Sequence, residues 1–220
     1  MKIYALPPEN RGKGLLFDFD STLYTNPAYQ KFQNDVLIDR FARLRGISSA
    51  EAHSLVDQKR EADAAAGLGR TSLGNVLLSF GIPIGTSVAW REELIRPGDW
   101  LRPDPQLVSA LSLLKARFAL CLVTNNPRSV GRAGLEALGA AGLFDAVIGL
   151  DDTLRSKPDP APYRAAAEAL QLSPTDCISI GDRYDVDLAP ALALGMGAIL
   201  VDGAADVYGL PGLLPGAGSR

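Results

Sequence analysis

The chain has 220 residues, of which 47% are hydrophobic and 21% are charged, and its formal net charge is −3. This composition is typical of a globular protein, and the length suits one α/β domain with a smaller insertion. The acidic balance argues against nucleic acid as a partner. No apolar run is long enough to cross a membrane, and the first residues lack a signal-peptide core. We therefore expect a cytoplasmic protein, and nothing in the sequence indicates a protein partner.

The first predicted buried strand, residues 15–19, runs into two acidic side chains, Asp18 and Asp20. Side chains of a strand alternate between faces, so both carboxylates should leave the strand on the same side. Their mutual repulsion has to be offset by a cation or by a shared proton. One carboxylate can then act as a nucleophile and its neighbour as an acid and base, with a divalent cation beside them.

Four further short apolar runs predict strands over residues 120–124, 146–150, 177–180 and 198–201. Helical patterns over residues 129–138, 160–170 and 186–194 follow three of the strands. Strands that alternate with helices predict an α/β fold with a parallel sheet, in which ligands bind beyond the carboxyl ends of the strands. Polar residues gather at those ends, namely Asp18, Asp20, Thr124, Asn125, Asn126, Asp151, Asp152 and Asp182.

Residues 24–100 show helical patterns in place of strand signals. Gly46 should end the first of these helices, and Ser48 with Glu51 forms a capping box at the start of a second helix that Gly67 could end. Shorter helices are predicted over residues 73–80 and 86–95. We expect an all-helical cap over residues 24–100, inserted into an α/β core made of residues 1–23 and 101–220. The cap could close over the acidic strand end as a lid, or it could be a fixed lobe.

The last stretch, residues 203–220, is rich in Gly, Ala and Pro and shows little periodicity, so we expect it to pack loosely. The two cysteines, Cys121 and Cys177, lie in apolar runs and should be reduced thiols in the core. His53 is the only histidine and lies in a polar helical segment, so we expect no catalytic role for it.

Three further motifs follow the acidic strand end in order. Thr124 ends an apolar run and is followed by Asn125, so that its hydroxyl and the nearby amides could bind an oxyanion. Lys157 precedes a predicted helix whose first turn carries prolines. Asp182, Asp185 and Asp187 follow the strand over residues 177–180.

Taken together, these four motifs resemble those of the haloacid-dehalogenase-like superfamily of phosphohydrolases, in the subclass with a helical cap. The resemblance implies a doubly wound Rossmann-like core. It also implies that Asp18 attacks phosphorus to form an aspartyl-phosphate, and that Asp20 protonates the leaving oxygen and then takes a proton from water. Mg²⁺ would be held by Asp18, by the backbone carbonyl of Asp20 and by Asp182.

The resemblance also implies roles for the remaining motif residues. Thr124 and the Asn125 amide would hold phosphoryl oxygens, and Lys157 would neutralise charge in the transition state. Asp187 and Asp185 would support the metal shell or orient Lys157, with capping of a helix N-terminus as an equally good interpretation.

The sequence therefore predicts a Mg²⁺-dependent phosphomonoesterase that acts on a small phosphorylated metabolite. The aspartate at position 20 favours phosphate esters over organic halides, because a halide leaving group needs no proton. Nucleotides, phosphoglycolate and sugar phosphates all stay open as substrates. The alternatives are phosphoglucomutase-like transfer and a non-catalytic family member that binds a phosphorylated ligand or a protein. Lys59, Arg60 and Arg70 of the cap could meet a second anionic group, although a solvated helix face is the favoured interpretation.

Overall fold

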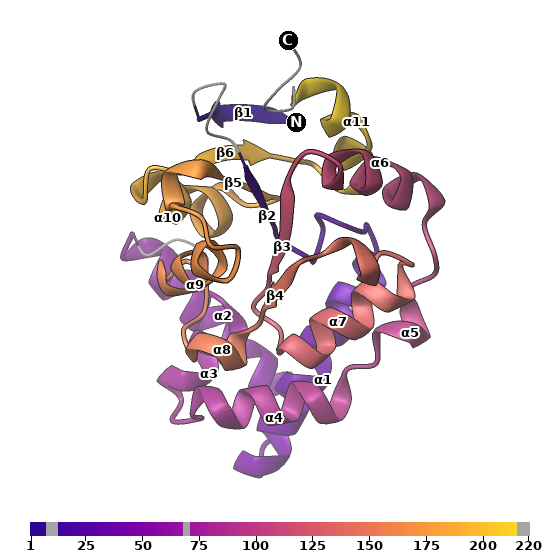
Figure 1. The fold of residues 1–220 in the computed structure, drawn as a ribbon. Helices are drawn as coiled ribbons and strands as arrows, with labels where there is room; N and C mark the ends of the chain where they lie inside the picture. The colour runs from indigo at the N-terminus through magenta and orange to yellow at the C-terminus, as the bar shows by residue number, and fades with distance from the viewer. Residues whose placement is uncertain (8–12, 68–70, 215–220) are drawn as a thin grey trace.

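The computed structural model describes residues 1–7, 13–67 and 71–214, which form a central sheet with helices on both faces (Figure 1). The sheet has the strand order β1-β6-β5-β2-β3-β4, and all neighbouring strands are parallel except β1, which is antiparallel to β6. The strands are β1 (Lys2–Ala5), β2 (Gly14–Phe17), β3 (Ala119–Val123), β4 (Ala146–Ile148), β5 (Cys177–Gly181) and β6 (Gly197–Leu200). The predicted α/β fold with a doubly wound parallel sheet is confirmed. All five predicted strands are present, whereas β1, an edge strand with mostly exposed residues, was not predicted although Ile3, Tyr4 and Ala5 are apolar.

The two faces of the sheet are covered by different helices. On one face, Leu15 and Phe17 of β2 pack in a hydrophobic cluster with α6 (Pro105–Lys115), α7 (Arg128–Ala137) and α11 (Ala204–Leu213). On the other face, Leu16 packs with α9 (Ala161–Ala169) and α10 (Ala189–Ala193). Neighbouring residues of β2 therefore serve opposite faces, as the period of a strand requires. Cys121 and Cys177 are free buried thiols of the second cluster, as predicted.

The prediction of a loosely packed C-terminal stretch is wrong for residues 204–214. Helix α11 covers all of them except Leu214, which caps its C-terminus, and Val207, Leu210 and Leu214 are buried in the core. The three apolar side chains are spaced by three and four residues, so they share one helix face that packs on the sheet despite the glycines and proline between them. Residues 215–220 lie outside the described part of the chain.

The segment between β2 and α6 is helical, as predicted. It contains α1 (Pro27–Arg45), α2 (Ser49–Ala65), α3 (Leu73–Ser79), α4 (Ile84–Leu94) and the short α5 (Pro97–Trp100). Gly46 ends α1 with a φ of 67°, and the Ser48–Glu51 capping box opens α2. These helices have a hydrophobic cluster of their own, which includes Phe41, Val56 and Leu77. The separate cluster supports the proposed cap, whose boundaries at residues 24 and 100 stay a prediction.

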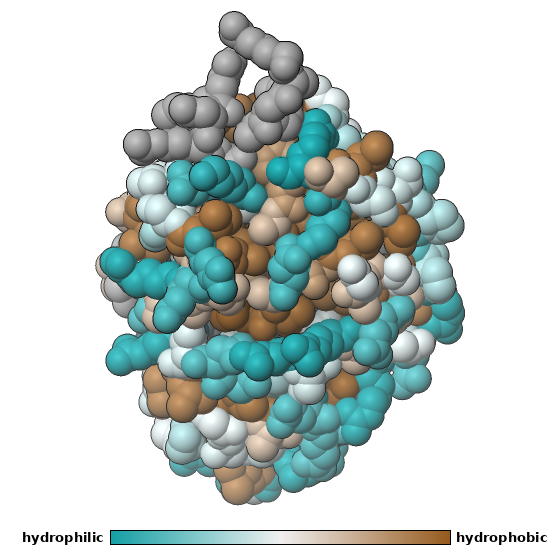
Figure 2. Space-filling view, in the orientation of Figure 1, coloured by the Kyte–Doolittle hydropathy of each residue, from teal (hydrophilic) through white to brown (hydrophobic). Residues whose placement is uncertain are grey.

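The helical segment lies below the sheet in the view of Figure 1, with α4 beneath α7 and α8 (Leu150–Thr153). Figure 2 shows that hydrophilic residues cross this face of the molecule in a band at about that level. Polar contacts join the segment to the core, because Ser129 donates to Glu92 at 2.7 Å and the hydroxyls of Ser72 and Ser156 lie 2.8 Å apart. In the described ranges, no helix has both the length and the apolar character that crossing a membrane requires.

Candidate active site

The candidate site lies where the central strands of the sheet end. Strand β2 lies between β3 and β5, and Asp18 follows it directly. The backbone N–H of Asp18 donates to Ile180 of β5 at 2.8 Å, which fixes the position of the acidic residue at the rim of the sheet. Thr124 and Asp182 follow the neighbouring strands β3 and β5. Because these strands are parallel and in register, the structure brings the three residues to the same rim.

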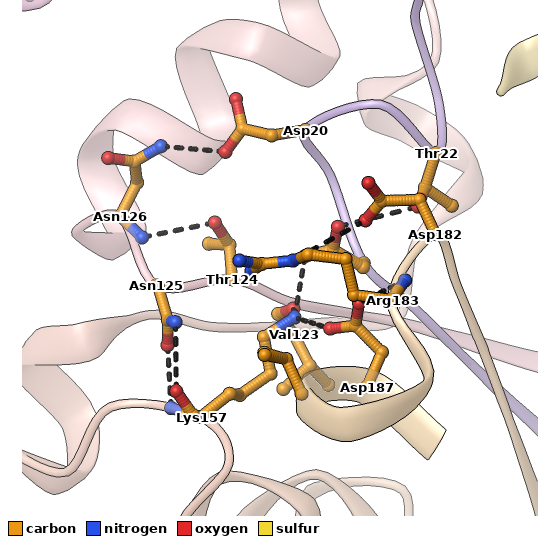
Figure 3. Close-up of polar contacts among 12 residues, drawn as sticks. Asp20, Thr22, Val123, Thr124, Asn125, Asn126, Lys157, Asp182, Arg183 and Asp187 are labelled. Atoms are coloured by element: carbon orange, nitrogen blue, oxygen red, sulfur yellow. Dashed lines mark hydrogen bonds and ion pairs between the residues drawn. The ribbon is translucent and has the colours of Figure 1, made fainter. Parts of the chain in front are cut away.

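Lys157 enters this rim from the loop before α9, and its side chain is only 1% exposed. Its ammonium donates to Asp18 Oδ1 at 2.5 Å, to Asp187 Oδ1 at 2.7 Å and to the carbonyl of Val123 at 2.9 Å (Figure 3). All three ammonium protons therefore have acceptors. These three bonds fix the positively charged ammonium group in one position beside Asp18.

The charges of this cluster act strongly on one another. Burial raises the pKa of Asp18 to about 7, and Lys157 opposes this effect while the neighbouring carboxylates add to it. Burial also raises the pKa of Asp182 to about 6. Burial disfavours the charged form of Lys157, yet the carboxylates of Asp18 and Asp187 outweigh that effect and raise its pKa. The lysine is therefore held as a cation, and the carboxylates of Asp18 and Asp182 take up protons more readily than ordinary aspartates do.

Three of the carboxylates could hold a cation. Asp18, Asp182 and Asp187 each offer an oxygen atom, and these atoms lie within 4.8 Å of one another. Carboxylate oxygens are the hard donors that Mg²⁺ prefers, so this part of the chain fits such an ion. Gly181 makes the close approach of Asp187 possible, because a Cβ at position 181 would lie 2.7 Å from Asp187 Cγ.

The carboxylate of Asp187 already has two partners in the protein. Its Oδ1 atom accepts from Lys157, and its Oδ2 atom accepts from the backbone N–H of Arg183 at 3.1 Å. It thus combines orientation of the lysine with the capping of the turn over Tyr184–Leu188. Asp185, in the same turn, is exposed and is not among the three clustered carboxylates, so its supporting role stays a prediction.

The carboxylate of Asp20 lies apart from the acidic cluster. It accepts from Gln33 Nε2 at 2.8 Å, from Asn126 Nδ2 at 3.1 Å and from the hydroxyl of Tyr24. Tyr24 shortly precedes α1 and Gln33 lies on α1, so the helical segment helps to hold this side chain. Asp20 also lines the cavity between core and helical segment, where a proton donor can reach a bound molecule.

Thr124 and Asn125 differ in how they are used. Thr124 Oγ1 accepts from the backbone N–H of Asn126 at 3.1 Å, which leaves its O–H free to donate to an oxyanion. The Asn125 side chain is engaged on both sides with the backbone of Lys157, accepting from its N–H at 2.7 Å and donating to its carbonyl at 3.2 Å. The side chain therefore positions the lysine loop, and the backbone N–H of Asn125 is the group left for a phosphoryl oxygen.

The two acids that follow β4, which were noted from the sequence only as polar residues at a strand end, bind other parts of the protein. Asp151 accepts from the backbone N–H of Arg128 at 2.7 Å, and Asp152 forms an ion pair with the side chain of the same arginine. Asp152 also accepts from the N–H of Gly149 at 2.7 Å. These contacts cap α8 and join it to the start of α7.

Several polar residues without a predicted role also lie at the site. Thr22 lies 3.4 Å from Asp18 Oδ2, and Asn126 donates from one amide to Asp20 and to Gln33. Gln33 is buried on α1, four residues after Tyr29 and four before Leu37, which are both core residues. A polar side chain on an otherwise apolar helix face is the signal that could have identified it.

A cavity of about 420 Å³ is lined by Asp20 and lies between residues of the core and of the helical segment. Its lining is mostly polar and includes Gln30, Gln33, Asn34, Arg60, Ser72, Arg91, Asn125, Asn126, Ser156, Asp182 and Arg183. Three basic residues, Lys59, Arg60 and Arg70, were candidates to meet a second anionic group. Lys59 forms an ion pair with Asp63. Arg60 is half-buried and lines the cavity, so the interpretation as a solvated helix face does not hold for it. Arg70 lies outside the described residues.

Several known proteins are similar to this chain in sequence or in fold. A phosphoglycolate phosphatase of Rhodospirillum rubrum is 29% identical over 206 residues, which cover 86% of this chain and 79% of that protein. The pyrophosphatase PpaX of Bacillus velezensis is 40% identical over 72 residues, and the chain spans only 33% of that protein. A HAD phosphatase structure from Thermococcus onnurineus shares the fold with a TM-score of 0.59 at 22% identity, covering 93% of this chain and 98% of that one. The model of the haloacid dehalogenase-like hydrolases matches residues 13–195, so the chain belongs to this family of hydrolases.

Proposed function

We propose that this protein is a Mg²⁺-dependent phosphomonoesterase that hydrolyses a small phosphorylated metabolite in the cytoplasm. The observation that carries the proposal is the position of Asp18, which is fixed by Lys157 at 2.5 Å and lies among further carboxylates at the rim of the sheet. The phosphatases among the relatives support the same reaction type.

In the first step, an oxygen of Asp18 attacks the phosphorus atom and the bond from phosphorus to the leaving oxygen breaks. Asp20, protonated at its carboxyl group, gives its proton to the leaving oxygen, so that the product departs as an alcohol. The hydrogen bonds of Gln33 and Asn126 hold the Asp20 carboxyl group in one orientation for this transfer. The product that stays behind is an acyl phosphate on Asp18.

In the second step, the Asp20 carboxylate takes a proton from a water molecule that attacks the same phosphorus atom. The bond to Asp18 breaks, inorganic phosphate leaves, and both carboxyl groups return to their starting states. The ammonium of Lys157, the hydroxyl of Thr124 and the backbone N–H of Asn125 stabilise the negative charge on the phosphoryl oxygens in both steps.

Asp18 and Asp182, with the backbone carbonyl of Asp20, would hold the magnesium ion, and Asp187 stands beside them. When bound, Mg²⁺ supplies positive charge that favours the ionised form of Asp18 and offsets the charge of the phosphate. The raised pKa of both clustered acids fits carboxylates that are arranged for a cation.

The direct test measures the release of inorganic phosphate from a panel of phosphate monoesters, with and without Mg²⁺. Phosphate release from at least one small monoester supports the proposal. An isomerised sugar phosphate without free phosphate would point to a mutase instead. If no member of the panel loses phosphate, the proposal is wrong.

A further inference from the structure

One arginine of the helical segment, Arg91 of α4, is buried beside the cavity. Its side chain is 6% exposed and lines the cavity together with Asp20. Its Nη1 atom donates to the carbonyl of Ser87 at 3.1 Å and to the Ser87 hydroxyl, both one turn earlier in the same helix. These two bonds direct the guanidinium back along α4 and fix one of its edges.

The other edge of the guanidinium makes no protein contact of this kind. Among the described residues, Nε and Nη2 of Arg91 have no hydrogen-bond acceptor, and no carboxylate lies within ion-pair distance. Next to Nη2 lies Gly74, where an added Cβ would be 3.9 Å from that atom, an ordinary van der Waals contact that leaves the hydrogen-bonding capacity of Nη2 unused. Gly74 also lines the cavity.

A buried guanidinium without an anionic partner is costly, because the protein interior solvates a charge poorly. The cost shows in the pKa of Arg91, which burial lowers to about 10 while the charge of Asp20 opposes that shift. Arginine stays protonated at neutral pH all the same. An anion that enters the cavity and contacts the guanidinium would offset this cost.

We propose that Arg91 binds a second oxyanion of the substrate, so that the protein selects phosphate monoesters that also carry a carboxylate or a further phosphate. This inference rests on the proposed function, because it identifies the substrate class of the same site. The planar edge of Nε and Nη2 matches the paired oxygens of either group in a bidentate contact. Arg91 would then act on substrate binding, while Asp18 and Asp20 carry out the reaction.

The experiment compares matched substrates with the Mg²⁺-loaded protein. For a carboxylate, 3-phosphoglycerate is compared with glycerol 3-phosphate, and for a second phosphate, fructose 1,6-bisphosphate is compared with fructose 6-phosphate. The readout is the ratio of kcat/KM within each pair. We expect a ratio of at least ten for one pair, and the pair that shows it identifies the oxyanion.

The variants assign that ratio to Arg91. Arg91→Met should lower the ratio at least tenfold, mainly through KM, because the lost contact contributes to binding. Arg91→Lys keeps the charge but loses the planar edge, so it should give an intermediate ratio. The matched control is Arg40→Met, which removes an exposed arginine of α1 that pairs with Glu93 and does not line the cavity. This control should leave the ratio unchanged.

The outcomes separate this inference from the proposed function. If monoesters are hydrolysed but neither pair shows a preference, or if Arg91→Met and Arg91→Lys both keep the wild-type ratio, the inference is wrong while the phosphatase assignment stands. If nothing is hydrolysed, substrate binding to the Asp18→Asn variant is measured by calorimetry. If the variant binds the doubly anionic member of a pair more tightly, and if adding Arg91→Met removes that difference, the inference is supported although the proposed function is not. Equal binding within both pairs overturns it.

Discussion

Gly134 of α7 lies directly against the ring of Phe19, and a Cβ at position 134 would be only 2.6 Å from Cε1 of that ring. Phe19 separates Asp18 from Asp20, so its packing fixes the spacing of the two acids. Gly134→Ala should therefore lower the free energy of unfolding by about 1–3 kcal/mol and reduce activity as well. Urea denaturation and phosphate release measure both effects. Gly142→Ala, which adds a Cβ in open space, is the control, and equal stability of the two variants would contradict the packing argument.

Asp18→Asn should abolish phosphate release and leave the fold intact, because the amide has the shape of the carboxyl group but is no nucleophile. Activity is measured with p-nitrophenyl phosphate and the fold by circular dichroism. Asp151→Asn is the matched control, since Asp151 only caps a helix and an amide oxygen can still accept from Arg128. Turnover by Asp18→Asn at the wild-type rate would remove the nucleophile assignment.

Asp20→Asn should distinguish between leaving groups. An alkyl phosphate needs a proton at its leaving oxygen, and loss of that proton donor should reduce kcat by about 10²–10⁴-fold. The p-nitrophenolate group leaves without protonation, so formation of the acyl phosphate from p-nitrophenyl phosphate should suffer much less. Burst kinetics with both substrates measure this difference. If the rate of the first step fell equally for both substrates, Asp20 would not act as the acid.

Mg²⁺ should be required for activity, and the affinity of the protein for Mg²⁺ should fall as the pH is lowered. The pKa of Asp18 is raised to about 7 and that of Asp182 to about 6, so protons compete with the cation below these values. Titrations between pH 5.5 and 8 should therefore give tighter binding at the upper end, and the melting temperature should rise with Mg²⁺ most strongly there. Full activity after exhaustive chelation, or an affinity independent of pH, would contradict the cation site.

Lys157→Met should destabilise the metal-free protein by about 3–5 kcal/mol at pH 8, because it leaves two buried carboxylates without their counter-charge. Urea denaturation measures this loss. Lys115→Met, which removes a more exposed ion pair with Asp145, should cost no more than about 1 kcal/mol. A Lys157→Met variant as stable as the wild type would mean that the buried lysine is not needed to offset the charge of Asp18 and Asp187.

The sequence was sufficient for the features that depend on local pattern. Apolar runs of strand length predicted five of the six described strands, and a Ser48–Glu51 pair predicted the start of α2. Parallel strands bring their ends to one rim, so the meeting of Asp18 with Asp182 followed from strand order, whereas the place of Lys157 beside them was implied by the family resemblance.

Features that depend on tertiary contacts could not be predicted in the same way. The polar ends of β3 and β4 look alike in sequence, yet Thr124 faces the site while Asp151 caps a helix, and only the position of Arg128 decides between them. Strand β1 was missed although residues 3–5 are apolar: it is an edge strand with most of its residues exposed, and its antiparallel pairing with β6 is a tertiary contact. Arg91 was overlooked because its burial depends on how α4 packs against its neighbours.

The hydrogen bonds of Asp20 connect substrate entry with the chemistry. Its carboxyl group is held from one side by Asn126 of the core and from the other by Tyr24 and Gln33, which belong to the connection into α1 and to α1 itself. Any movement of α1 that widens the cavity must therefore also break bonds that aim the proton donor. In the proposed reaction, Asp20 would therefore be aligned for proton transfer only while α1 contacts the core, so both departure of the leaving group and hydrolysis of the acyl phosphate would depend on the closed arrangement.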